Sequence, residues 1–393
     1  MPGLILLLTL NLVPLISNFR KHLRSDLESP EAERQFGKGW ISGVAALVLA
    51  LSGFLLILSL SFPSWFSVPQ IRDLYGNPIF HVGLLLGLVA AFILAIISLV
   101  LRQKKILGFT ALFLVVLATT LGGTHAATGA TGASPVYFGV DWFVLNVIFT
   151  GLLFVPVELL FPRHKGQELF RFEWREDLFY YFVSSMMVQC LTYISLLPAT
   201  ELTSHTNWTA FRATVASQPL WLQFIEIMFL TDLVQYWLHR AFHRVPFLWN
   251  FHAVHHSAQV MDWMAGARMH FLEIMVLRGT TVIPMYILGY NQTALHFYIF
   301  YVYLHSTFIH ANVGWTLPRL GKMIVTPRFH HWHHGLEAEA VDVNFALHFP
   351  LLDRVFGTYH LPGKEWPKGY GIAGHPVPRS YWQQFLYPFR RKK

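Results

Sequence analysis

The sequence predicts an all-α, polytopic membrane protein. Apolar residues make up 54% of the 393 residues and charged residues only 13%, and the mean hydropathy is +0.44. Several uncharged runs are long enough to cross a bilayer as helices, which satisfy their own backbone hydrogen bonds in lipid. The net charge of +8 would suggest nucleic acid as the partner of a soluble chain. Because the cations here flank apolar runs, the positive charge indicates a membrane surface as the partner instead. We therefore expect no nucleic-acid partner.

Nine segments are expected to span the membrane. Residues 1–19 carry no charge and lack the basic start of a signal peptide, so we expect a first span that ends near Ser17. The other eight runs are each long enough, or nearly so, to cross a bilayer. They lie at residues 41–62, 81–101, 106–123, 139–161, 179–199, 219–238, 272–290 and 293–311.

Lys and Arg are distributed unevenly between these runs. With nine spans, 26 of the 29 fall on the side that also holds residues 239–271 and 312–393. The positive-inside rule places that side, and the C-terminus with it, in the cytoplasm. The last two spans form a hairpin around residues 289–291, so all the histidine-rich segments lie on one membrane face.

Histidines gather in three short groups on that face. Of the 21 histidines, five lie before residue 239 and sixteen from it onward. Spacings of three and four residues within a group place the rings on one face of a helix. Single histidines often cap helices or pack in cores, but three such groups predict a metal site. The grouped residues are His239 and His243; His252, His255 and His256; and His330, His333 and His334.

The metal ligands must be nitrogen or oxygen atoms, because Cys190 is the one cysteine. Eight grouped histidines, with His310 at the end of the last span as a ninth, suffice for two metals, whereas one zinc needs about four ligands. Iron suits nitrogen ligands and activates dioxygen by redox chemistry, so we expect two iron ions, which zinc can replace in recombinant protein. The predicted fold is a bundle of spans under a cytoplasmic, histidine-rich, di-metal cap. Such a centre beside a bilayer predicts oxidation of a lipid C–H bond.

Other polar residues near the groups are candidates for supporting roles. Asp232 and Tyr236 share a helix face with His239 and His243, at about 100° per residue. A carboxylate in an apolar span is costly without a partner, so we expect Asp232 to accept the outward N–H of a ligating histidine. The alternative is a helix-packing carboxylate. We take Asp232, Tyr236 and Asn312, which follows His310 closely, as candidate catalytic residues.

The remaining histidines carry weaker predictions. His331 points off the face of its ligand-spaced neighbours and is expected to support a ligand. His270 opens the eighth span, and the sequence leaves open whether it is a ligand or a cap. Isolated histidines such as His305 and His348 are expected to be structural or solvated.

At these residues the chain resembles the fatty acid hydroxylase / sterol desaturase superfamily of membrane di-iron oxygenases. The resemblance runs over residues 139–361, and it departs from the family at Phe271, where relatives often carry proline. It implies hydroxylation or desaturation of a lipid with dioxygen, and the eight grouped histidines as iron ligands, with His310 as a further one. It rests on HRAFH at 239–243, LWNFHAVHHS at 248–257, ARMHFLE at 267–273, TPRFHHWHH at 326–334 and DVNF at 342–345.

The resemblance divides the chain into three parts. Residues 1–124 form an accessory transmembrane region of four spans, outside the family core, and residues 139–361 form the catalytic domain. Residues 362–393 form a basic C-terminal tail, expected to wrap the surface, although its cations also suit anionic lipid headgroups.

Activation of dioxygen needs electrons, and the chain shows no dinucleotide fingerprint, no cysteines for an iron–sulfur cluster and no evident haem module. We therefore expect an external donor, a ferredoxin or a cytochrome-type protein with its reductase, beside the lipid substrate and the bilayer. Basic residues could steer an acidic donor to the cytoplasmic face: Arg240, Arg244, Arg319 and Lys322. The main alternative is a histidine-rich metal-binding or transport protein, which would place ionisable groups along the span interiors instead of at their ends.

Overall fold

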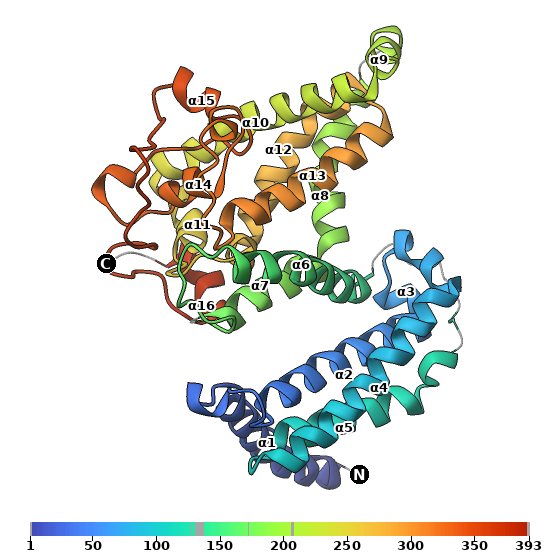
Figure 1. Cartoon of the computed structure of the whole chain (residues 1–393). Helices are drawn as coiled ribbons and strands as arrows, with labels where there is room; N and C mark the ends of the chain where they lie inside the picture. The colour runs from blue at the N-terminus through green and yellow to red at the C-terminus, as the bar shows by residue number, and fades with distance from the viewer. Residues whose placement is uncertain (1, 127, 130–136, 172, 206–207, 391–393) are drawn as a thin grey trace. The chain divides into compact units, whose positions relative to one another are not determined.

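This computed structural model describes residues 2–126, 128–129, 137–171, 173–205 and 208–390. The described residues form helices and loops and contain no strand, only isolated bridges between Pro162 and Val313 and between Gly335 and Tyr370. The predicted all-α class is therefore confirmed (Figure 1). The chain divides into two compact units, Met1–Leu145 and Asn146–Lys393.

Helices build the first unit, and most of them are long and apolar. They are α1 (Pro2–Leu27), α2 (Trp40–Ser61), α3 (Pro63–Phe66), α4 (Pro78–Leu101) and α5 (Ile106–Thr120). Helix α2 packs on α4 and α5 through a buried cluster of small residues, Ala46, Ala50, Ala91, Ala95 and Ala111. A Cβ at Gly53 would come within 2.7 Å of the Leu88 side chain, so the Leu88 side chain packs directly against the backbone of α2 there. Small residues allow the close approach by which apolar helices associate in lipid.

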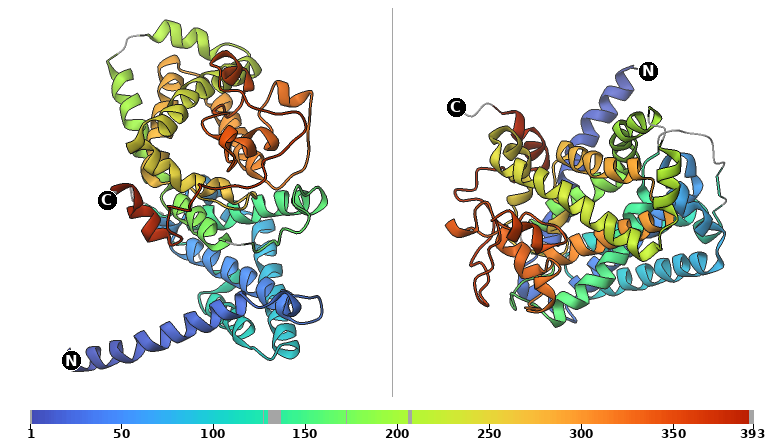
Figure 2. Two further views of the ribbon diagram at one scale, coloured as in Figure 1. Left: turned by 90° about the vertical axis from the view of Figure 1, so that its left-hand side faces the viewer. Right: turned by 90° about the horizontal axis from the view of Figure 1, so that it is seen from above.

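The second unit contains the histidine groups. Helix α6 (Val140–Leu160) leads into it, and its other helices follow in order: α7 (Trp174–Met186), α8 (Val188–Ser204), α9 (Thr209–Ala216), α10 (Leu220–Arg244), α11 (Pro246–His256), α12 (Phe271–Leu288), α13 (Gln292–His310), α14 (Pro327–His333), α15 (Pro350–Val355) and α16 (Tyr381–Leu386). Helices α10, α12 and α13 lie side by side, with α8 against α12 (Figures 1 and 2). Helix α10 contacts α11, and helix α13 contacts α14.

Two turns between helices carry local signals in the sequence. Helix α10 ends at Arg244 and α11 begins at Pro246, after a single extended residue, Val245. Proline suits the first helical position because its fixed φ is already helical and it lacks an N–H that would go unsatisfied. The predicted turn around residues 289–291 joins α12 to α13: Gly289 ends α12 with a left-handed φ of 73°, and the Asn291 side chain caps α13.

Five helical segments in the described parts of the chain are long and apolar enough to cross a membrane. They are Trp40–Ser61, Pro78–Leu101, Ile106–His125, Val140–Leu160 and Phe271–Leu288. The prediction of one continuous helix over 179–199 is wrong, because the chain breaks at Met187 between α7 and α8. Helices α10 and α13 are long but carry polar residues such as Asp232 and His305, which lower their apolar character.

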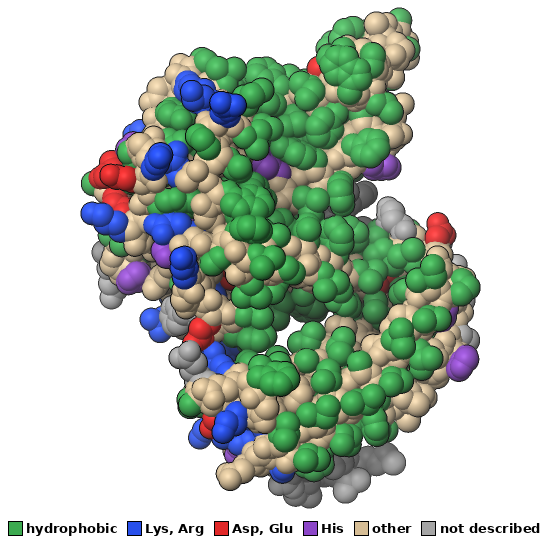
Figure 3. Space-filling model, viewed as in Figure 1, with side chains coloured by type: hydrophobic (Ala, Val, Ile, Leu, Met, Phe, Trp, Pro, Cys, Tyr) green, Lys and Arg blue, Asp and Glu red, His purple; other side chains and the backbone are tan. Residues whose placement is uncertain are grey.

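The surface of the second unit is uneven. Hydrophobic side chains cover the flank formed by α10, α12 and α13, whereas Lys, Arg, Asp and Glu gather over the loops of the C-terminal third (Figure 3). Exposed apolar residues on these helices include Trp237, Phe297, Ile299 and Phe300. A large apolar flank is costly in water and matches a membrane surface.

Candidate metal centre

Five histidine side chains converge in what we call group A. One ring nitrogen from each lies within 4.8 Å of all the others. His239 Nε2 is 3.0 Å from His252 Nε2, and His256 Nε2 is 3.1 Å from the same atom. The group draws on α10, α11 and α14 and comprises His239, His243, His252, His256 and His333.

Four further histidines form group B: His255, His310, His330 and His334. His310 Nε2 lies 3.4 Å from His255 Nε2 and 3.0 Å from His330 Nε2. His334 Nε2 lies 3.2 Å from His330 Nε2. The two groups adjoin, because the His256 ring of group A stacks on the His334 ring of group B with centroids 4.4 Å apart. The structure thus brings together all nine histidines that the sequence marked as ligands.

Hydrogen bonds define which nitrogen carries the proton in two rings of group A. His239 Nδ1 donates to the Phe345 carbonyl at 2.8 Å, and His252 Nδ1 donates to Glu273 Oε1 at 2.5 Å. A neutral imidazole protonated at Nδ1 presents a lone pair at Nε2. Two lone pairs therefore face each other at 3.0 Å, an arrangement that is repulsive unless a cation lies between them.

Group B repeats this pattern. His255 Nδ1 donates to the Arg268 carbonyl at 3.0 Å, and His310 Nδ1 donates to the Ser306 carbonyl at 2.6 Å. Their Nε2 lone pairs face each other at 3.4 Å. The proton positions in both groups thus favour a metal ion at each centre.

The nitrogen spacing also fits a metal. Ligand nitrogens at about 2.1 Å from a metal, with angles of about 90–110° between them, are roughly 3.0–3.4 Å apart. The Nε2 contacts of both groups fall in that range. In addition, His243 Nε2 and His333 Nε2 are buried with no hydrogen-bond partner among the described residues. Nitrogen-rich sets of this kind suit iron or zinc.

Burial keeps these rings in the neutral form that binds metal. It lowers the pKa of His239 to about 4. Burial first, and then repulsion from neighbouring imidazoles, lowers the pKa far below 6.5 for the ligands on α11 and α14 and for His243. The same holds for His330 and His334 of group B.

Glu273 is a functional candidate that the sequence reasoning missed. It lies in the first turn of α12, its side chain is buried, and it accepts the Nδ1 proton of His252. A carboxylate in this position fixes the tautomer of the ligand and raises its basicity. The signal was an acidic residue at the start of an apolar helix, within ARMHFLE. It was overlooked because 21 residues of sequence separate it from His252.

Asp232 lies on the expected face of α10, but its predicted bond to a ligating histidine is wrong. Its two oxygens accept from the backbone N–H groups of Leu347 at 2.7 Å and Phe349 at 2.6 Å. The loop after α14 returns to α10 at this depth, so backbone donors reach the carboxylate, while His239 uses the Phe345 carbonyl of the same loop.

Tyr236 and Asn312 contact the scaffold. Tyr236 shares a hydrogen bond of 2.7 Å with Thr358 Oγ1. Asn312 Oδ1 accepts from the His164 backbone N–H at 2.9 Å, and its own backbone N–H donates to Glu158. Neither side chain has a hydrogen bond to a group A or group B histidine in the described part of the chain. Both residues thus contact the scaffold, and their catalytic roles stay a prediction.

The histidines outside the two groups have other partners. His331 lies 2.9 Å from Tyr370 Oη and 3.3 Å from the His310 carbonyl, so it contacts the backbone of a ligand. His270 caps α12 by accepting from the Leu272 N–H and donating to the Phe385 carbonyl. His305 and His348 are buried, and their Nδ1 atoms lie 3.2 Å apart. Among the described residues, neither ring has a hydrogen bond to a histidine of group A or group B.

A buried ion network lies behind group B. Arg268, whose carbonyl holds His255, is fully buried, and its guanidinium donates to Asp177 and Glu173. Arg171 pairs with both Asp177 and Asp262. Buried charges require such partners, and the network fixes the segment that precedes α12.

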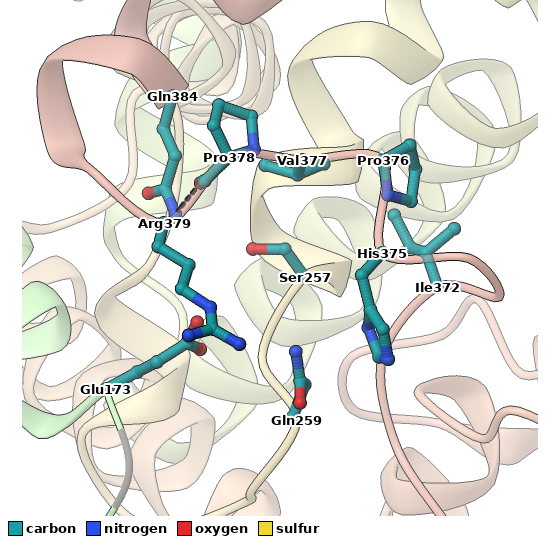
Figure 4. A pocket seen from close by; sticks show the side chains of 10 residues that line it. All are labelled: Glu173, Ser257, Gln259, Ile372, His375, Pro376, Val377, Pro378, Arg379 and Gln384. Atoms are coloured by element: carbon teal, nitrogen blue, oxygen red, sulfur yellow. Dashed lines mark hydrogen bonds between the residues drawn. The ribbon is translucent and has the colours of Figure 1, made fainter.

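A surface pocket of about 280 Å³ adjoins this network (Figure 4). Glu173 and Arg379 line one side of it, and Ser257, Gln259 and His375 point toward its other side. A second pocket of about 560 Å³ lies between residues 164–168 and 368–370. Neither pocket is lined by a histidine of group A or group B.

Comparison with known proteins agrees with this geometry. Residues 224–358 match the model of the fatty acid hydroxylase family. The match begins within α10 and ends just after α15, so it includes every histidine of both groups. None of the solved structures matches the chain.

Curated relatives are lipid-oxidising enzymes by name. Ornithine lipid hydroxylase OlsE of Rhizobium tropici is 28% identical over 174 residues, which are 44% of this chain and 52% of that protein. Alkylglycerol monooxygenase of Xenopus tropicalis is 30% identical over 158 residues, 40% of this chain and 33% of that protein. A putative methylsterol monooxygenase of Dictyostelium discoideum is 23% identical over 236 residues, 56% of this chain and 86% of that protein.

The chain thus spans about half the length of the first of these relatives and about a third of the second. The similarity is concentrated where the histidines are. Over residues 224–358 this chain is thus similar to the fatty acid hydroxylase family.

Proposed function

We propose that the chain is a membrane-bound, non-haem di-iron enzyme that uses dioxygen to hydroxylate a C–H bond of a lipid. The observation that carries the proposal is the pair of adjoining histidine groups with Nε2 lone pairs facing one another. Hydroxylation is favoured over desaturation because the matched relatives are named as a lipid hydroxylase and as monooxygenases. Transport of metal is disfavoured, because the described groups form one compact, buried centre instead of a series along the helices.

Two bound iron ions would supply the redox chemistry that activates dioxygen. One oxygen atom enters the lipid C–H bond as a hydroxyl group, and the other leaves as water with two electrons and two protons from outside. The chain's own residues would hold the ions: group A offers five imidazoles and group B four. Burial excludes bulk water from these rings, and the Nδ1 partners fix their orientation.

We further propose that the centre lies on the cytoplasmic side with the C-terminus. The distribution of Lys and Arg supports this orientation. In this topology α10, α13 and the α7–α8 segment would complete the nine spans with α1 and the five apolar segments. The tail from residue 362 lies on the same side, although residues 391–393 are outside the described part of the chain.

The electrons come from a separate donor in this proposal. Arg319 and Lys322 are exposed and available to steer an acidic ferredoxin or cytochrome-type protein. Arg244 is 3.2 Å from Asp342, and Arg240 lies over the Trp237 ring. These two are therefore less free to steer a donor than the sequence suggested.

The test is lipid mass profiling of cells that express the wild-type chain or His333→Ala, grown under isotopically heavy dioxygen. We expect a lipid that gains one heavy oxygen atom with the wild type and not with the variant. A product that loses two hydrogens without the label would indicate desaturation. An unchanged lipid profile in cells that also supply a donor would contradict the proposed activity.

A further inference from the structure

The loop of residues 342–349 lies against group A. Three of its residues meet the Nδ1 atoms of group A ligands. The Phe345 carbonyl accepts from His239 at 2.8 Å. The Val343 carbonyl accepts from His333 at 2.8 Å. Asp342 Oδ1 lies 3.4 Å from His243 Nδ1.

The backbone of this loop has an unusual conformation. Asp342 has a φ of 60° and Asn344 a φ of 58°, both in the left-handed region. Residues with a Cβ rarely adopt this left-handed backbone conformation, and asparagine and aspartate are the residues that tolerate it best. Asp342 and Asn344 alternate with Val343 and Phe345, the two residues whose carbonyls hold ligands. A strained backbone conformation of this kind persists only where many surrounding contacts hold it in place, which is often the case at functional sites.

Asn344 supplies one set of those contacts. Its side chain is fully buried. Its amide nitrogen donates to the Phe329 carbonyl at 3.0 Å and to the His360 carbonyl at 2.7 Å. Its amide oxygen accepts from the His360 backbone N–H at 2.8 Å. The side chain thereby ties the loop to α14, the helix that also carries His333.

Two buried carboxylates hold the rest of the loop. Asp353 accepts from the backbone N–H groups of Phe345 at 2.7 Å and Ala346 at 3.0 Å. Asp232 accepts from Leu347 and Phe349. The loop is thus fixed at both ends by side chains that belong to α10, α15 and the loop itself.

Group B receives no hydrogen bond from this loop. The Nδ1 atoms of His255 and His310 donate to carbonyls at Arg268 and Ser306. The Nδ1 atoms of His330 and His334 have no partner among the described residues. A change in the loop should therefore act first on group A, whose imidazoles it contacts directly.

We infer that the 342–349 loop is a positioning element for one of the two metals: Asn344 and Asp342 hold the loop in the conformation that orients three imidazoles of group A, those of His239, His243 and His333, for iron binding. This inference rests on the proposed two-iron centre. It assigns Asn344 and Asp342 to positioning, since neither supplies one of the converging ligand nitrogens.

The test is the iron content of purified, folded protein after anaerobic loading with Fe(II). Asn344→Ala removes the side-chain bonds of a left-handed residue and should reduce the bound iron from two ions per chain to one. Adding His334→Ala, which weakens group B, should remove the second ion. Asn291→Ala, which removes a helix cap at the start of α13, is the matched control and should retain both ions.

Asp342→Asn provides a second variant, because asparagine keeps the left-handed backbone accessible. It removes the negative charge beside His243 Nδ1 and should weaken the binding of one of the two ions by ~10–100-fold, the usual effect of altering a ligand's outer partner. Wild-type iron binding in Asp342→Asn, or simultaneous loss of both ions from folded Asn344→Ala, would overturn the inference. A wild-type chain that holds two ions but oxidises no lipid would contradict the proposed function without contradicting this inference.

Discussion

At the scale of single residues, the centre depends on which acceptor each imidazole reaches. The ligands themselves were predictable, because spacings of three and four residues on a helix need no tertiary information. Their outer partners were not predictable, because backbone carbonyls such as those of Phe345 and Arg268 leave no mark in the sequence. Asp232 was in phase with the ligands and was chosen for that reason, but the actual carboxylate, Glu273, comes from another helix.

Glu273 gives a direct prediction at this scale. Glu273→Gln removes the charge that strengthens His252 as a ligand and should weaken iron binding in group A by ~10–100-fold. Glu273→Leu should weaken it further, since it leaves the His252 N–H unpaired. The measurement is an anaerobic Fe(II) titration. Glu226→Gln, at a partly buried carboxylate on α10 that accepts from Gln218, is the control. Equal affinities in wild type and Glu273→Leu would show that the carboxylate has no influence on the metal.

The buried histidines give a second prediction, on pH. The pKa of His239 is about 4 in the folded chain, against an ordinary value of 6.5. Between these values the unfolded chain binds more protons than the folded chain, so the free energy of unfolding rises with pH. Metal-free protein should therefore lose stability as the pH falls from 6.5 toward 4, and the same acidification should release bound iron. The check is the apparent unfolding temperature in detergent across that window. A temperature that is constant there would contradict the neutral, buried state of the rings.

At the scale of elements, helices were predicted better than the loops that position them. The α10–α11 turn and the α12–α13 hairpin follow from local signals, a proline after His243 and a glycine after an apolar run. The break at Met187 has no such signal, because the residues around it continue the apolar pattern. The loop over 342–349 was visible only as the motif DVNF, and its conformation depends on contacts with α10, α14 and α15 that are remote in sequence.

Asp232 provides the prediction for this scale. Each carboxylate oxygen accepts one backbone N–H of the loop, and an asparagine could replace only one of these acceptors. Asp232→Asn should therefore destabilise the folded chain by about 1–3 kcal/mol, the cost of a buried donor without a partner. It should also weaken group A, through the loop, more than group B. Unfolding in detergent and iron content measure the two effects, and a variant that matches wild type in both would show that the bonds to the loop are dispensable.

At the scale of the whole molecule, the sequence was sufficient for the helical class and for the membrane, because apolar composition and helix length decide both. It was not sufficient for the number of spans. Helices such as α10 and α13 carry the polar residues of the metal centre. They are therefore less apolar than a helix that only crosses the membrane. Both histidine groups lie within the second compact unit, residues 146–393.

The most direct test of the account is the number of iron ions held by each folded chain, determined by elemental analysis after anaerobic loading. We predict two ions in the wild type. His333→Ala, in group A, and His255→Ala, in group B, should each retain one, and the double variant should retain none. No more than one ion in fully loaded wild-type protein would contradict the two-metal centre, as would the loss of both ions from either folded single variant.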